Sequence, residues 1–184
     1  FGLFGGSIHQ LGSREHHEKY LPDVATMALP GCFAMTETGH GSNVYDIETT
    51  ATYDPETRDL EIHTPHRRAR KDYIGNAAND ALMATVFAQL KVGDEEHGVH
   101  AILVRIREDE GTSVQGVTIE DCGEKLGLNG VDNGRLTFDH VRVPRENLLD
   151  RFAWINDDGA YRSPIANPTK RFFTMLGTLV AGRG

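Results

Sequence analysis

The sequence predicts a mainly β domain, an antiparallel barrel-like fold flanked by helical segments at both ends. Between residues 31 and 150, about six or seven short segments rich in β-branched residues alternate with turn-forming Pro, Gly, Asp and Asn. No helical pattern separates these segments, which favours an antiparallel barrel or sandwich over an alternating α/β fold. Residues 1–29 and 172–181 instead carry helical patterns.

The first stretch is predicted to contain a polar helix within residues 12–22. Ser13 is a suitable N-cap, because its hydroxyl can accept a hydrogen bond from a free N–H of the first turn. Pro22 is the expected end of this helix, since proline lacks the N–H that would continue the hydrogen-bond ladder.

A strand that begins at residue 31 and a hairpin are predicted next. Residues 47–54 alternate in polarity, which is typical of a half-buried strand. Residues 54–57 have the composition of a β-turn with proline in second place, so residues 60–63 are expected to return antiparallel. One face of the first strand comprises Ile47, Thr49, Ala51 and Tyr53.

The middle of the chain supplies the remaining strands. Residues 81–92 form a long apolar run, which pattern alone assigns to neither strand nor helix. Residues 99–106 are β-branched, and residues 116–119 and 135–143 add two further strands. Pro144 is expected to end the last of them.

The chain is expected to be a segment of a larger protein. It starts with Phe1 rather than Met, lacks the features of a signal peptide and ends in an apolar helical stretch without a partner in its own sequence. Residues 151–169 contain two prolines and are predicted to be a linker to that last helix.

Composition argues against several classes of protein. The 184 residues include 19 Lys and Arg against 27 Asp and Glu, and this net charge of −8 argues against nucleic-acid binding. No apolar run reaches the roughly 20 residues that span a bilayer, so no membrane association is expected. Cys32 and Cys122 are too few for a disulfide scaffold and are expected to be reduced core thiols.

The spacing of the nine histidines indicates no metal site. His9, His16 and His17 are expected to be solvated helix residues. No serine or cysteine stands in a nucleophile motif, and the glycine fingerprints of nucleotide-binding folds are absent. His63 and His66 flank Pro65 and are expected to be ordinary loop residues, and neither His97 nor His100 has a plausible partner.

Residues 31–44 stand apart, because a buried-looking strand runs directly into a loop of small and hydroxylated residues. Glycines let backbone N–H groups approach an anion or a planar acceptor closely. Thr36 and Ser42 add hydroxyls that can donate to a ligand oxygen or ring nitrogen. A ligand site and an ordinary hairpin loop, whose hydroxyls satisfy its own backbone, are the two interpretations of this segment.

The same segment resembles the flavin-site motif of the acyl-CoA oxidases, a branch of the acyl-CoA dehydrogenase superfamily. Further segments resemble this family in the same order, so the resemblance covers essentially the whole chain. The motif reads Cys32-Phe33-Ala34-Met35-Thr36-Glu37-Thr38-Gly39-His40-Gly41-Ser42-Asn43. The other segments are residues 4–6, 16–21, 48–57, 132–136 and 143–149.

The resemblance implies a subunit of three domains. Residues 1–30 are then the end of an N-terminal helical domain, and residues 151–184 a linker and the start of a C-terminal helical domain. Residues 31–150 are then the central β-barrel domain, which binds FAD and acyl-CoA. A homodimer or a larger homo-oligomer is expected for the full-length protein.

The resemblance also assigns roles to single residues. Thr36 matches the threonine that hydrogen-bonds the flavin ring, and Gly75 matches a second flavin-contact position. Tyr73 stands where many dehydrogenases carry a tryptophan beside the flavin. Ser42, with Gly41 before it, resembles the part of the loop that lies near the acyl-CoA substrate.

The implied reaction oxidises a fatty acyl-CoA to the trans-2-enoyl-CoA and reduces dioxygen to hydrogen peroxide. The family's base is a glutamate expected beyond Gly184, so no catalytic residue is expected in this chain, and Glu37 and Glu124 are not assigned that role. The implied location is the cytoplasm of a bacterium or the peroxisome of a eukaryote.

Two alternatives remain at this point. The first is an acyl-CoA dehydrogenase that passes electrons to an electron-transfer flavoprotein, although the spelling Gly39-His40-Gly41 favours the oxidase branch. The second is a non-catalytic β-barrel binding module, which predicts that the intact protein is purified without flavin.

Overall fold

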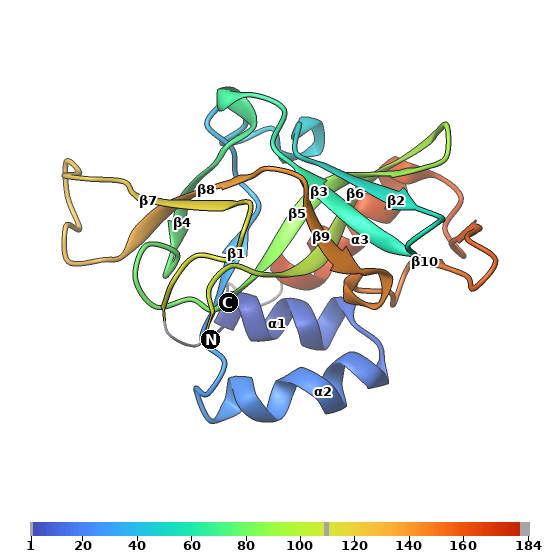
Figure 1. The fold of residues 1–184 in the computed structure, drawn as a ribbon, viewed down its shortest axis with the longest axis horizontal. Helices are drawn as coiled ribbons and strands as arrows, with labels where there is room; N and C mark the ends of the chain where they lie inside the picture. Colours follow the sequence, from blue (N-terminus) through green and yellow to red (C-terminus); the bar gives the residue numbers. More distant parts are fainter. Residues whose placement is uncertain (1, 109–110, 181–184) are drawn as a thin grey trace.

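The computed structural model describes residues 2–108 and 111–180 and confirms the mainly β prediction. A large curled sheet occupies the middle of the molecule, with helices packed below and behind it and a smaller sheet extending to one side (Figure 1). None of the helices within the described residues is long and apolar enough to cross a membrane.

The large sheet has the strand order β1-β5-β2-β3-β9, with β6 on the other edge of β5. The predicted hairpin is confirmed, since β2 and β3 pair antiparallel from Thr50 opposite His63 to Asp54 opposite Asp59. The strands are β1 (Gly31–Ala34), β2 (Thr50–Asp54), β3 (Asp59–His63), β5 (Met83–Val92), β6 (Glu95–Arg105) and β9 (Val141–Pro144).

Two strand pairs in this sheet are parallel, which corrects the expectation of a wholly antiparallel fold. β1 pairs parallel with residues 83–86 of β5, and β2 pairs parallel with residues 89–92. Because β5 is ten residues long, β1 and β2 occupy successive halves of one edge. Parallel pairings join segments that are far apart in the chain. No short turn connects such strands, so the sequence contains no turn motif that would predict the pairing.

The smaller sheet has the order β4-β8-β7 and is antiparallel throughout. The strand predicted over residues 135–143 is in fact two strands in different sheets. The chain turns at Asp139–His140, where His140 has a φ of +52°, and passes from β8 to β9. The strands are β4 (Lys71–Gly75), β7 (Val117–Asp121) and β8 (Asn133–Phe138).

The predicted helices are present at both ends, with one difference. Ser13 is the N-cap of α2, as predicted, but this helix continues past Pro22 to Ala25. Proline removes one hydrogen bond, to the carbonyl of exposed Glu18, and water can replace it there. The α-helices are α1 (Gly2–Leu11), α2 (Arg14–Ala25) and α3 (Pro168–Val180); the 3₁₀ helices are Val44–Asp46, Arg67–Ala69 and Arg145–Asn147. The predicted linker holds a short hairpin, β10 (Trp154–Ile155) and β11 (Tyr161–Arg162).

Two apolar clusters, one on each face of the large sheet, form the core. The side chains of Val86 and Leu90 on β5 join the cluster on the side of the smaller sheet. Phe87, on the same strand, joins the cluster that packs against the helices. A strand buried on both faces loses its polar alternation, which explains why residues 81–92 could not be assigned from pattern.

The cysteines differ from each other in their environments. Cys32 lies in the core, as expected, and burial raises the pKa of its thiol to about 12. Cys122 follows β7 and is half-exposed, so the expectation of a core thiol is wrong for this residue. Only Val117 of β7 is buried, so the end of this strand offers no core position for the thiol.

Candidate functional site

The residues that the sequence singled out meet at one pocket of about 660 Å³. The loop after β1 forms one wall and β4 forms another, although the two segments are far apart in the chain. The pocket is lined by all five predicted binding residues, Thr36, Gly41, Ser42, Tyr73 and Gly75. Concave sites of this size with a few polar groups are typical of small-molecule binding.

A buried ion pair holds the two walls together. The Lys71 ammonium donates to the Glu37 carboxylate at 3.0 Å and to the carbonyl oxygens of Met35 and Phe87 at 3.1 and 2.7 Å. Both side chains are completely shielded from solvent. Because Glu37 follows Thr36 and Lys71 begins β4, this pair fixes the loop against the strand.

The charges of this pair are well satisfied. The Glu37 carboxylate also accepts hydrogen bonds from the backbone N–H groups of Glu48 and Thr49 and from the Thr49 hydroxyl. Burial alone would raise the pKa of Glu37, but Lys71 and these donors outweigh it and hold the pKa below its ordinary value. Burial lowers the pKa of Lys71 to about 8. Glu37 therefore has a structural role in holding the loop against β4.

Thr36 links the loop to β4 through both its backbone and its side chain. Its carbonyl oxygen accepts from the Asp72 N–H at 3.1 Å, and its hydroxyl donates to the Asp72 carbonyl at 2.9 Å. The side chain is half-buried at the pocket wall, so its hydroxyl oxygen is also placed to meet a bound group.

Tyr73 lies in a bulge of β4 that turns its ring outward. Its φ of +57° is unusual for a residue other than glycine, and the pairing with β8 shifts register between Lys71 and Ile74. The Asp72 carboxylate supports the bulge by accepting from the Tyr73 N–H and from Arg135. Burial opposes ionisation of Asp72, but these and the Thr38 hydroxyl hold its pKa below the ordinary value.

The glycines of the pocket leave open space. A Cβ atom added at Gly41 or Gly75 would meet no heavy atom within 4 Å, and both residues are exposed. At Gly31 a Cβ atom would instead collide with the Phe4 ring, so that glycine allows α1 to pack on β1. The pocket therefore has room for a flat group beside Gly75.

Several lining residues were not identified from the sequence. Phe4 and Leu3 of α1 and Leu176 of α3 contribute apolar surface, and Asn76 follows β4 with a φ of +68°. Leu3 and Leu176 belong to no motif, and the segment of residues 4–6 gave no sign that Phe4 lines the pocket, since these positions depend on how the helices dock. Among the described residues, no carboxylate lines this pocket; Glu124 lies exposed in the loop after β7.

The structure corrects the interpretation of several histidines. His16 is buried, and its Nε2 lies 2.8 Å from the Glu146 carbonyl oxygen. His100 is buried between the Gly98 carbonyl and the Tyr161 hydroxyl, with Nδ1 and Nε2 each at 2.9 Å. His97 stacks on the Tyr161 ring. Glu146 and Tyr161 belong to other elements than the histidines they contact, so sequence spacing could not reveal them.

The comparisons with known proteins show the fold and the family of this chain. A mainly β domain with a glycine- and hydroxyl-rich loop at a pocket has the form that small-molecule-binding domains commonly take. Residues 32–141 match the family described as acyl-CoA dehydrogenase, middle domain, and the chain belongs to this family.

Individual relatives are named as oxidases. The chain is 48% identical over 183 residues to peroxisomal acyl-coenzyme A oxidase 3 of Arabidopsis thaliana, and it spans 27% of the length of that protein. It superposes on acyl-CoA oxidase 1 from Yarrowia lipolytica with a TM-score of 0.91 and 39% identity, covering 99% of this chain and 26% of the other. For Caenorhabditis elegans acyl-CoA oxidase 2, bound with FAD, ascaroside-CoA and ATP, the TM-score is 0.89 at 35% identity, covering 95% and 26%.

Proposed function

We propose that this chain is the FAD- and acyl-CoA-binding middle part of an acyl-CoA oxidase. The observation that carries the proposal is the pocket where the loop of Thr36 meets the strand of Gly75. The oxidases named above support it, and since the chain spans about a quarter of their length, the activity proposed is that of the whole protein. Residues 1–30, 31–150 and 151–184 are assigned to the three domains as expected from the sequence; the family match over 32–141 supports this division.

The residues of the pocket fit a flavin. Gly75 leaves open space on β4 where a planar ring can lie, and Thr36 offers a hydroxyl at the neighbouring wall. Tyr73 places an exposed aromatic ring at the same rim, 62% accessible. We assign Thr36, Tyr73 and Gly75 to the cofactor. When bound, FAD supplies the acceptor for the substrate's hydride and the route by which dioxygen is reduced.

The exposed loop fits the substrate role proposed for Gly41 and Ser42. Both residues border the same pocket as Thr36, and both are open to solvent. The glycine lets the backbone approach a ligand closely, and the Ser42 hydroxyl can donate to a substrate oxygen. The base that removes the α-proton is assigned to a glutamate outside this chain, since Glu37 is occupied by Lys71.

Thr36 has a specific electrostatic role in this proposal. A hydroxyl directed at an acceptor atom of the ring stabilises the negative charge that develops there as the substrate is oxidised. The hydroxyl holds one proton, which it donates to Asp72 in this structure, so donation to the ring requires it to rotate. Its oxygen can also accept a hydrogen bond without leaving Asp72.

The whole protein is proposed to oxidise fatty acyl-CoA to trans-2-enoyl-CoA with dioxygen as electron acceptor, and to act as a homodimer or larger homo-oligomer. The names of the relatives favour an oxidase over a dehydrogenase. In a eukaryote the proposed location is the peroxisome, as in the Arabidopsis relative; in a bacterium it is the cytoplasm. The full-length protein should form peroxide from palmitoyl-CoA faster than it reduces an electron-transfer flavoprotein; the reverse preference would indicate a dehydrogenase.

Gly75→Val in the full-length protein tests the flavin site directly. The new side chain enters the space assigned to the ring, so the variant should fold but be purified largely without FAD. Gly130→Val is a matched control, because it also adds a side chain in open space but lies away from the pocket. Flavin absorbance per protein chain is the measurement, and a Gly75→Val protein with normal flavin content would refute the assignment.

A further inference from the structure

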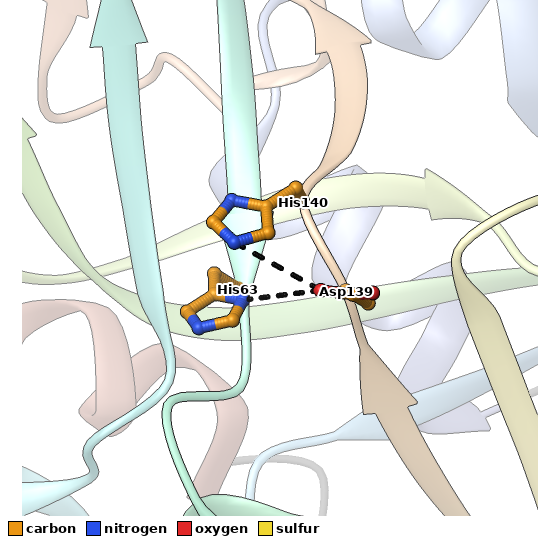
Figure 2. A group of neighbouring side chains, drawn as sticks. All are labelled: His63, Asp139 and His140. Carbon is orange, nitrogen blue, oxygen red and sulfur yellow. Dashed lines mark ion pairs between the residues drawn. The ribbon is translucent and has the colours of Figure 1, made fainter.

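Three side chains with metal-binding atoms converge at the junction of the two sheets. Figure 2 shows His63 at the end of β3 and Asp139 and His140 in the turn between β8 and β9. The antiparallel register of β3 and β9 places Ile62 opposite Val141, so His63 and His140 face each other one step further along. None of the three residues lines the proposed flavin pocket.

The distances within this group suit a shared cation. The Asp139 Oδ1 atom lies 4.0 Å from His63 Nδ1 and 3.8 Å from His140 Nε2. The three ligand atoms all lie within 4.8 Å of one another. Ligand atoms around a tetrahedral Zn²⁺ are about 3.3 Å apart, given Zn–N and Zn–O bonds of about 2.0–2.1 Å. Both distances from Asp139 are therefore within 1 Å of this spacing.

Glu61 orients one of the two imidazoles. Its Oε1 atom lies 2.8 Å from His140 Nδ1, so that nitrogen carries the proton and donates it to the carboxylate. The Nε2 atom of a neutral His140 then has a free lone pair on the side of Asp139. A carboxylate behind a metal-binding histidine is a common supporting arrangement, which fixes the tautomer and raises the basicity of the ligand.

His63 provides a second, independent sign of a ligand. Its Nδ1 atom is shielded from solvent and, within the described part of the chain, has no hydrogen-bond partner. A shielded polar atom without a partner is costly, and a bound cation would satisfy it. The two rings are stacked at 4.1 Å, so one must turn for both nitrogens to reach one ion. The His140 side chain is 58% exposed, which leaves it room to turn.

We propose that His63, Asp139 and His140 form a binding site for a divalent transition-metal ion, with Zn²⁺ as the expected occupant. Two imidazoles and one carboxylate leave a fourth position for water, and this ligand set favours Zn²⁺ over Ca²⁺ or Mg²⁺. The ion would join the end of β3 to the turn by which the chain passes from the smaller sheet to the large one. The site is independent of flavin binding.

The test is a calorimetric titration of the full-length protein with ZnCl₂ at pH 7.5. The wild-type protein should bind one equivalent of Zn²⁺ at this site. The dissociation constant of this Zn²⁺ should rise at least tenfold in each of the variants His63→Ala, Asp139→Asn and His140→Ala, and about tenfold in Glu61→Gln. His9→Ala is the control, because His9 also stacks on a histidine, His17, but no third ligand among residues 2–108 and 111–180 joins that pair. Its Zn²⁺ affinity should be unchanged, and flavin content should be normal in every variant.

The outcome that would overturn the proposal is Zn²⁺ binding that is absent in the wild type or unaffected by these substitutions. If a variant fails to fold, X-ray absorption at the zinc edge of the wild-type protein with one equivalent of Zn²⁺ decides instead. Scattering from two imidazoles with oxygen ligands supports the site, and a shell without imidazole refutes it.

Discussion

The Thr36 hydroxyl is the side-chain group that carries most of the proposed flavin chemistry within this chain. It is half-buried at the pocket wall and already bound to the Asp72 carbonyl. The same oxygen therefore contributes to the position of β4 and to the proposed ring contact.

Thr36→Val in the full-length protein should weaken FAD binding or slow flavin reduction by about 1–2 kcal/mol, the scale of one hydrogen bond to a ring acceptor. The FAD dissociation constant and stopped-flow reduction with palmitoyl-CoA give the measurement. Thr36→Ser keeps the hydroxyl and should stay close to wild type. If Val and Ser behave alike, and like the wild type, Thr36 does not contact the ring.

His100 makes stability depend on pH. Burial lowers its pKa from 6.5 to about 3, and its contacts with Gly98 and Tyr161 fit a neutral ring that donates from Nδ1 and accepts at Nε2. The unfolded chain therefore binds one more proton than the folded chain between these pH values. The free energy of unfolding falls as the pH drops from about 6.5 to 3, by up to about 1.4 kcal/mol per pH unit.

His100→Asn should be less stable at pH 8 but show a flatter dependence on pH between 6.5 and 3. Denaturant unfolding at a series of pH values measures this slope. Burial also lowers the pKa of His97, so part of the slope should remain in the variant. An unchanged slope would mean that His100 is protonated in the folded protein at these pH values.

At the scale of elements, the Glu37–Lys71 pair joins the loop after β1 to β4 and β5. Lys71 reaches the carbonyl oxygens of Met35 and Phe87 as well as Glu37, so one ammonium joins β4 to both the loop and β5. A buried ion pair is seldom a net source of stability, but its geometry is specific. Here it sets the distance between the two walls of the pocket.

Glu37→Gln should destabilise the fold by about 3–5 kcal/mol, because it leaves the Lys71 charge buried without its counter-ion. The double variant Glu37→Gln with Lys71→Met should cost less than the sum of the two single changes, since the uncompensated charge is gone. Unfolding in urea measures all three. Strict additivity of the two costs would show that the pair is not coupled.

At the scale of the whole molecule, the pocket depends on elements from both ends of the chain. Leu3 and Phe4 of α1 and Leu176 of α3 line it beside the loop and β4. The relatives are almost four times longer than this chain, which spans 27% of the first of them. A flavin site shared with further domains is expected to be incomplete in the isolated chain.

The 184-residue chain alone should bind FAD weakly and form no peroxide from palmitoyl-CoA. Ligand stabilisation follows RT ln(1 + [L]/Kd), so weak binding predicts almost no thermal shift with FAD well above micromolar concentrations. Far-UV circular dichroism checks that the chain is folded. Peroxide above the free-flavin background would place the base within these residues, and Glu37 and Glu124 would be the first to mutate.

The sequence by itself determined the mainly β class, the hairpin of residues 50–63 and the loop that holds Thr36 and Ser42. These features depend on local signals: turn residues, alternation of polarity and a contiguous motif. The alternating strand was predictable because its buried residues, Ile47, Thr49 and Ala51, all lie on the same face of the strand.

Only the tertiary structure decided which distant segments meet. The parallel pairing of β1 and β2 with β5, the division of residues 135–143 between two sheets and the contact of Lys71 with Glu37 are all non-local. The approach of His63 to His140 is also non-local, and the two residues are too far apart in the sequence to form a recognisable metal-ligand motif. Which strands pair, and which strands are buried on both faces, depends on how the whole chain packs. Neither property produces a periodic pattern of polar and apolar residues in the local sequence.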